Sequence, residues 1–175
     1  MTVKIIQKDD PRLRETAQEV PKKEIGTEKI NKIIDNMKEA LASQDDGVAI
    51  AAPQIGILLR IFVISGKVMN IIKADEETEY PDMVFINPSI TNKSKEKALV
   101  EEGCLSVRWL YGKIKRSKKV EIRALDESGK LIKRGSSGLL AQIFQHEIEH
   151  LDGKLFIDEA VELYEYNPEQ LKRDE

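Results

Sequence analysis

Two histidines four residues apart, on the apolar side of a predicted helix, constrain this chain more than any other feature. The segment 136–153, SSGLLAQIFQHEIEHLDG, has apolar residues at helical spacing, serines at its start and Gly153 at its end. His146 and His150 therefore lie one turn apart, about 6 Å at Cβ, and can bind one metal ion together. Burying both without a partner would be costly. We predict a metal site on this helix.

The helix also carries a carboxylate suited to catalysis. His146-Glu147-Ile148-Glu149-His150 matches HExxH, in which Glu147 can reach a metal-bound water without binding the metal itself. A catalytic site of this kind has three protein ligands and one open position. The residues leave two sources for the third ligand: the lone Cys104, or a later glutamate among Glu159, Glu162 and Glu165.

Composition narrows the class of protein. The 175 residues include 28 Lys and Arg against 31 Asp and Glu, so no net positive charge attracts nucleic acid or anionic membranes. A single cysteine excludes an internal disulfide, and the N-terminal segment lacks the apolar core of a signal peptide. We expect one cytoplasmic domain spanning 1–175, without a membrane segment.

The remaining pattern predicts an α+β fold. Residues 27–43 form an amphipathic helix with Thr27 as its N-cap, and 66–82 is an acidic, solvated excursion. The acidic end, 158–175, is expected to be a partly frayed tail. Extended runs cover 61–65, 83–90 as far as Pro88, 98–106, 120–125 and 131–132. We expect small antiparallel or mixed sheets packed around the helix with the histidines.

Three ordered motifs then make the chain resemble a peptide deformylase. GVAIAAPQ at 47–54 resembles the first motif of that family, EGCLS at 102–106 matches the second in full, and QHEIEH at 145–150 resembles the third. The resemblance extends from the turn at Asp10-Pro11 to about Asp158. Three motifs in this order are far more specific than HExxH alone.

The resemblance implies both a metal centre and a reaction. Its metal ligands would be Cys104, His146 and His150, with water in the fourth position. Ferrous iron is the typical ion, and zinc, nickel or cobalt readily replaces it. The enzyme would remove the formyl group from the N-terminal formyl-methionine of nascent polypeptides and release formate. Glu147 would act as general base and acid, while the Gln54 side chain and the Leu105 amide would stabilise the oxyanion.

The resemblance also implies how a peptide binds. The chain would add as a strand between Val48-Ala49-Ile50 and Gly103, so that backbone pairing accepts many sequences. An apolar pocket for the methionine side chain would be lined by Val48, Val100, Leu139, Ile143 and the ring of His146.

Four departures from the family pattern surround these motifs. Ala49 replaces a usual glycine and would narrow the cleft. Glu149 replaces aspartate and is expected to keep an ion pair with Arg116 that orients the helix. Arg108-Trp109 follows the second motif where many relatives have Pro-Gly, which would alter the loop beside the cleft. Gln142 replaces an apolar residue near the side-chain pocket.

Several alternatives remain at this level. A metalloendopeptidase would use one of the later glutamates as its third ligand, and a catalytically weak deformylase-like protein would only bind metal. The run at 113–119 places five cations in seven residues. Such runs are mostly solvated strand faces. The second interpretation is transient docking to ribosomal RNA, without sequence-specific recognition of nucleic acid.

Overall fold

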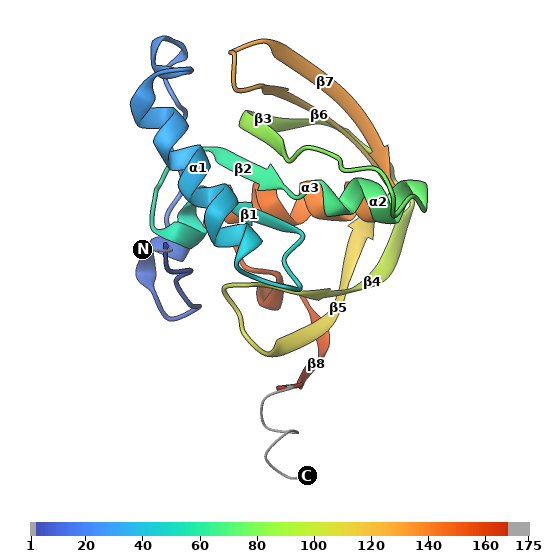
Figure 1. Ribbon diagram of the computed structural model, residues 1–175. Helices are drawn as coiled ribbons and strands as arrows, with labels where there is room; N and C mark the ends of the chain where they lie inside the picture. The colour runs from blue at the N-terminus through green and yellow to red at the C-terminus, as the bar shows by residue number, and fades with distance from the viewer. Residues whose placement is uncertain (1–2, 168–175) are drawn as a thin grey trace.

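The structure is a computed structural model that describes residues 3–167. These residues form an α+β fold, as the sequence predicts, with two antiparallel sheets and three α-helices (Figure 1). The described pairings between named strands are all antiparallel. Of the two expected kinds of sheet, antiparallel or mixed, the structure therefore has the antiparallel kind. Among the described residues, each helix is too short or too polar to cross a bilayer.

The N-terminal helix, α1, confirms the predicted amphipathic helix at 27–43. It spans Glu28–Ala42, and the hydroxyl of Thr27 accepts a hydrogen bond from the amide of Ile30. Its buried stripe includes Ile30, Ile34 and Met37, which pack in one cluster with residues of β1 and β2. The helix therefore covers one face of the larger sheet (Figure 1).

The larger sheet has the strand order β1-β2-β3-β6-β7. Alternation sends Ile61 and Val63 into the cluster with α1, whereas Phe62 and Ile64 join the cluster with α3. The rings of Phe62 and Phe85 stack with centroids 4.8 Å apart. The sheet is therefore buried on both faces at this point. Its strands are β1 (Ala49–Ala51), β2 (Ile61–Ile64), β3 (Met83–Lys93), β6 (Lys119–Leu125) and β7 (Leu131–Ser137).

The smaller sheet has the order β4-β5-β8, with strands Lys97–Gly103, Leu110–Ser117 and Val161–Glu165. The helix α3, Gly138–Leu151, lies between the two sheets in Figure 1 and contacts strands of both. It ends before Gly153, which adopts φ +72° where its Cα approaches the backbone of Arg14 too closely for a side chain. The predicted stop is confirmed.

Two predicted segments differ in part from the structure. The solvated excursion at 66–82 contains the helix α2, Lys67–Lys73, which buries only Val68. The predicted strand end at Pro88 is an irregularity inside β3, because Asn87 adopts φ +50° and the strand register shifts between Ile86 and Ser89. Proline is tolerated at such a bulge because no ladder hydrogen bond is required of its nitrogen.

The strand boundaries near the site also differ. The extended run expected over 98–106 ends at Gly103, and a turn follows. The tail expected to fray from 158 onward begins with a 3-10 turn, Phe156–Asp158, and then pairs with β5 as the strand β8. Residues 168–175 of that predicted tail lie outside the described residues.

Candidate active site

A thiol and two imidazoles converge where β4 ends against α3. His146 and His150 come from successive turns of α3, and Cys104 directly follows Gly103 at the end of β4. One ligand atom from each of these residues lies within 4.8 Å of the other two. The Sγ of Cys104 is 3.2 Å from Nε2 of His150. The spacing and donor types fit a single transition-metal ion.

The environment of His150 favours the neutral imidazole that a metal ion requires. Its side chain is buried, and burial lowers its pKa well below the ordinary value for histidine. A buried histidine without charge offers a lone pair to a cation.

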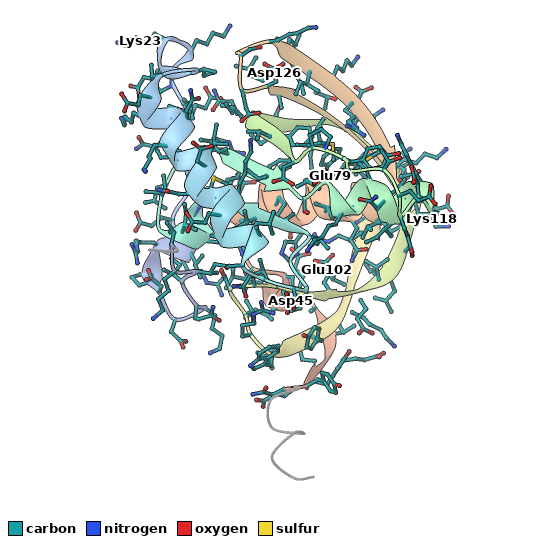
Figure 2. All side chains as sticks on the ribbon, viewed as in Figure 1. Lys23, Asp45, Glu79, Glu102, Lys118 and Asp126 are labelled. Carbon is teal, nitrogen blue, oxygen red and sulfur yellow. The ribbon has the colours of Figure 1, made fainter. Side chains whose placement is uncertain are left out.

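His146 is oriented by a carboxylate. Its Nδ1 lies 2.7 Å from Oε1 of Glu102, which leaves Nε2 for the shared site. Burial raises the pKa of Glu102, but hydrogen bonds from Arg116 and His146 outweigh it and lower that pKa to about 2. In Figure 2, Glu102 lies between α3 and the smaller sheet. It therefore remains an anion that holds the imidazole in place.

Arg116 ties the carboxylate of Glu102 to the helix. Its Nε and one terminal nitrogen donate to the two oxygens of Glu102 at 2.8 and 2.7 Å. Its other terminal nitrogen donates to Glu149 at 2.6 Å, which is the expected pair despite the longer side chain. Gln142 adds a hydrogen bond of 3.3 Å to Glu102 and one of 2.8 Å to the carbonyl of Glu101. A network of hydrogen bonds thus links β4, β5 and α3.

Glu147 is buried beside the two imidazoles. Its side chain lines the cleft, and Oε2 has no hydrogen-bond partner among the described residues. Burial raises the pKa of this carboxyl to about 7. A carboxylate with a free oxygen and a pKa near neutrality can accept and return a proton.

The later glutamates lie away from this cluster. Glu162 and Glu165 are on β8 with exposed side chains, and Glu162 pairs with Lys113 at 2.6 Å. Glu159 follows the 3-10 turn and is also exposed. Of the described residues, those that form the candidate metal group are the two histidines and Cys104.

Gln54 and Leu105 both lie beside the cysteine. The side-chain oxygen of Gln54 accepts from the amide of Ala51, so its Nε2 points to Ser106 Oγ at 3.1 Å and Cys104 Sγ at 3.6 Å. The carbonyl of Leu105 accepts from Gln7. Within residues 3–167, the amide of Leu105 has no hydrogen-bond acceptor. Both groups line the cleft and can donate to a bound oxygen.

A cleft of about 380 Å³ joins these groups. Of the residues expected to bind substrate, Val48, Ala49, Gly103, Leu139 and Ile143 line it. Ala49 does not have positive φ, so its methyl group narrows the cleft without backbone strain.

Two of the expected substrate residues do not line the cleft. Ile50 is fully buried on the α1 side of β1, because successive residues of a strand face opposite ways. Val100 is paired with Ile114 and lines a second cavity of about 670 Å³, which shares only Leu139 and Gln142 with the cleft. The predicted place of Val100 in the methionine pocket stays a prediction, because Leu139 and Gln142 line both cavities.

The sequence did not indicate an ion pair at the border of the cleft. Arg108 binds the two carboxylate oxygens of Asp46 at 2.6 and 3.1 Å and the side chain of Gln44 at 2.7 Å. It also lies over the ring of Trp109 at 5.0 Å. Asp46 precedes β1 and Arg108 follows β4. Arg108, which stands where many relatives have proline, therefore joins the β1 side of the cleft to the β4 side. Neither residue carries a local pattern that predicts this pairing.

The basic run at 113–119 is not a continuous cationic face. Arg116 is buried in the network described above, Lys113 pairs with Glu162, and Lys118 pairs with Glu96. Three of its five cations are therefore already neutralised by carboxylates.

Comparisons with known proteins agree with this geometry. The family model described as Polypeptide deformylase matches residues 2–165. The chain is 42% identical over 161 residues to "Peptide deformylase 1A, chloroplastic" of Solanum lycopersicum, covering 88% of this chain and 58% of that relative. It is 42% identical over 154 residues to "Peptide deformylase 2" of Clostridium acetobutylicum, covering 88% and 92%.

Solved structures show the same fold. A class I type b peptide deformylase from Acinetobacter baumannii superposes with a TM-score of 0.80 at 29% identity, covering 91% of this chain and 99% of that one. A peptide deformylase from Synechococcus elongatus, in complex with actinonin, gives 0.77 at 30% identity, covering 98% and 82%. The chain spans 58% of the length of the Solanum lycopersicum relative and 61% of "Peptide deformylase 1A, chloroplastic/mitochondrial" of Arabidopsis thaliana. With its three motifs gathered in one cleft, the chain belongs to the polypeptide deformylase family.

Proposed function

We propose that residues 1–175 form one catalytic domain that removes the formyl group from N-terminal formyl-methionine of nascent polypeptides and releases formate. The observation that carries this proposal is the buried Glu147 near the cluster of Cys104, His146 and His150. Among the described residues, its Oε2 has no hydrogen-bond partner. A structural metal site is normally closed by four protein ligands and has no use for such a carboxylate.

The metal ligands would be Cys104, His146 and His150. A divalent ion held there supplies a Lewis acid that polarises a carbonyl and lowers the pKa of water. We propose Fe²⁺ as the native ion because the family resemblance implies it. Zn²⁺, Ni²⁺ or Co²⁺ are proposed as replacements, since a thiolate with two imidazoles accepts each of them. The HExxH helix holds two of the three ligands rigidly between the sheets.

The protein groups would divide the chemistry among them. Glu147 takes the proton from the attacking water and passes it to the leaving amine. The Nε2 of Gln54 and the amide of Leu105 donate to the oxygen of the formyl carbonyl as it gains charge. Glu102 and Arg116 keep the His146 ring fixed, and Glu149 holds Arg116 to α3.

The peptide would bind as an additional strand between the two sheets. β1 is an edge strand of the larger sheet and β4 is an edge strand of the smaller sheet, so each has one unpaired edge. Backbone groups of Val48, Ala49 and Ile50 would pair on one side and those of Gly103 on the other. The methionine side chain would lie toward α3, against Leu139 and Ile143, which line the cleft.

The proposed setting is the cytoplasm, where a formyl-methionyl chain leaves the ribosome. A transient ribosome contact would have to rely on Lys115 and Lys119, because the other cations of 113–119 have carboxylate partners. We propose no membrane partner and no sequence-specific nucleic acid.

Formate release tests the proposal. The protein is purified anaerobically with its metal and incubated with formyl-Met-Ala-Ser, acetyl-Met-Ala-Ser and an unblocked peptide of about ten residues. We expect formate from the first peptide, little acetate from the second and no internal cleavage of the third. A metal-loaded protein that releases no formate would contradict the proposed activity, and internal cleavage would support the endopeptidase alternative.

A further inference from the structure

Two tyrosines form an aromatic wall beside the cleft. Tyr111 belongs to β5 and lines the cleft, and Tyr164 belongs to β8, the outer strand of the smaller sheet. The two residues are partners in the strand register, and their rings stack with centroids 5.7 Å apart and planes 24° apart. We call this pair the aromatic wall.

The wall reaches the cleft because Gly103 has no side chain. Gly103 is the register partner of Tyr111, and a Cβ at position 103 would lie 2.6 Å from Cε1 of Tyr111. The tyrosine ring therefore lies across the surface of β4 where other residues would place a side chain. The absence of a Cβ at 103 brings an aromatic face to the edge where the peptide is proposed to bind.

Tyr164 holds the wall in position. Its hydroxyl donates a hydrogen bond to the carboxylate of Glu101, which also lines the cleft. The residue is nevertheless 45% exposed. A pair of stacked rings at the edge of a cleft, with Tyr111 half-buried and Tyr164 exposed, offers a rigid apolar surface to a ligand.

Strand alternation decides which part of the substrate meets this surface. Glu102 and Arg116 face α3, whereas Glu101, Gly103 and Tyr111 are on the opposite face of the smaller sheet. A peptide strand beside β4 that turns its methionine toward α3 must turn its second side chain to the face of Tyr111. Neighbouring strands are about 4.8 Å apart, so that side chain lies next to Gly103 and under the tyrosine ring.

From this geometry we infer that Tyr111, supported by Tyr164, selects the second residue of the formyl-methionyl peptide and favours aromatic over small side chains there. The inference rests on the proposed function and adds a preference to it. Contact with a rigid ring forms in the bound substrate and persists during the reaction, so it lowers KM more than it raises kcat.

The test compares formyl-Met-Phe-Ser with formyl-Met-Ala-Ser. For the metal-loaded protein we expect kcat/KM to be about 3- to 10-fold higher for the phenylalanine peptide, mostly through KM. Tyr111→Ala should bring this ratio to about one, and Tyr164→Ala should reduce it at least about twofold. Tyr111→Phe, which retains the ring that faces the cleft, should preserve it. Tyr80→Ala, outside the smaller sheet, is the matched control and should leave the ratio unchanged.

Each outcome decides between the claims. A wild-type ratio below about two, or a ratio that survives Tyr111→Ala, overturns the aromatic wall and leaves the proposed function standing. The aromatic wall is also overturned if Tyr80→Ala lowers the ratio as much as Tyr164→Ala. Failure to release formate from either peptide overturns the proposed function and the inference that rests on it.

Discussion

The imidazole of His146 and the carboxylate of Glu102 are joined by a contact of 2.7 Å between Nδ1 and Oε1. Arg116 holds the same carboxylate with two further hydrogen bonds. The side chains of Arg116 and Glu102 are each only 4% exposed, so this ion pair is isolated from solvent. Its integrity should therefore matter for the stability of the fold as well as for the orientation of a metal ligand.

Arg116→Met tests how much this network contributes to the stability of the fold. The substitution leaves Glu102 buried without its cation, and loss of one partner of a buried pair costs about 3–5 kcal/mol. We expect urea denaturation to show a loss of that size in the free energy of unfolding. Lys115→Met, an exposed neighbour on β5, is the matched control and should change it by less than about 0.5 kcal/mol. Equal effects of the two substitutions would argue against the network.

Cys104→Ala tests the third ligand. Metal analysis after anaerobic purification should fall from one ion per chain to a small fraction, because two imidazoles alone hold a metal weakly. Glu162→Gln, which changes a candidate ligand of the alternative hypothesis, should retain the full metal content. Retention in the cysteine variant together with loss in the glutamine variant would reverse the assignment.

Glu147→Gln tests the proton carrier separately from the metal. The amide keeps the size of the side chain but cannot accept a proton, so we expect kcat for formate release to fall about 10²–10⁴-fold. The metal content should remain at the wild-type level, since the candidate metal group is Cys104, His146 and His150. A variant with near wild-type turnover would show that another group carries the proton.

Asp158→Asn tests a pH-dependent clasp between the N-terminal segment and the turn after α3. Arg14 donates to both oxygens of Asp158, at 2.6 and 3.0 Å, and these hydrogen bonds lower the pKa of that carboxyl below 3.8. A pKa depressed by folding stabilises the protein above the unfolded pKa, and the effect is lost as the pH falls through the folded pKa. The stability difference between wild type and variant should therefore be constant above about pH 5 and shrink below about pH 4.

Arg14→Met provides the control for this clasp. Without the guanidinium, Asp158→Asn should have little further effect at any pH in chemical denaturation. A stability difference that stays the same down to pH 2.5 would contradict the assignment to Asp158.

Local sequence patterns were sufficient for the two long helices and for the elements of the metal centre. In α1 the apolar spacing and Thr27 mark the helix directly, and in α3 the HExxH pattern fixes the relative positions of both histidines. Cys104 could be joined to them only through the family resemblance, because the residues themselves also allowed a later glutamate.

Features that depend on contacts between distant segments could not be predicted in this way. The acidic composition of 158–175 suggested a frayed tail, although β8 is held by pairing with β5, about fifty residues earlier. The face of β4 on which Val100 lies is defined only by pairing with β5, where its register partner is Ile114. Glu102 begins the second motif, but its contact with His146 spans 44 residues and leaves no local signal.

Titration of activity with metal tests the central claim most directly. The protein is stripped of metal with a chelator, then supplied anaerobically with Fe²⁺, and formate release from formyl-Met-Ala-Ser is measured at each addition. A single site at Cys104, His146 and His150 predicts a rate that rises linearly and becomes constant at one equivalent per chain. A rate that is independent of added metal, or absent at every addition, would contradict it.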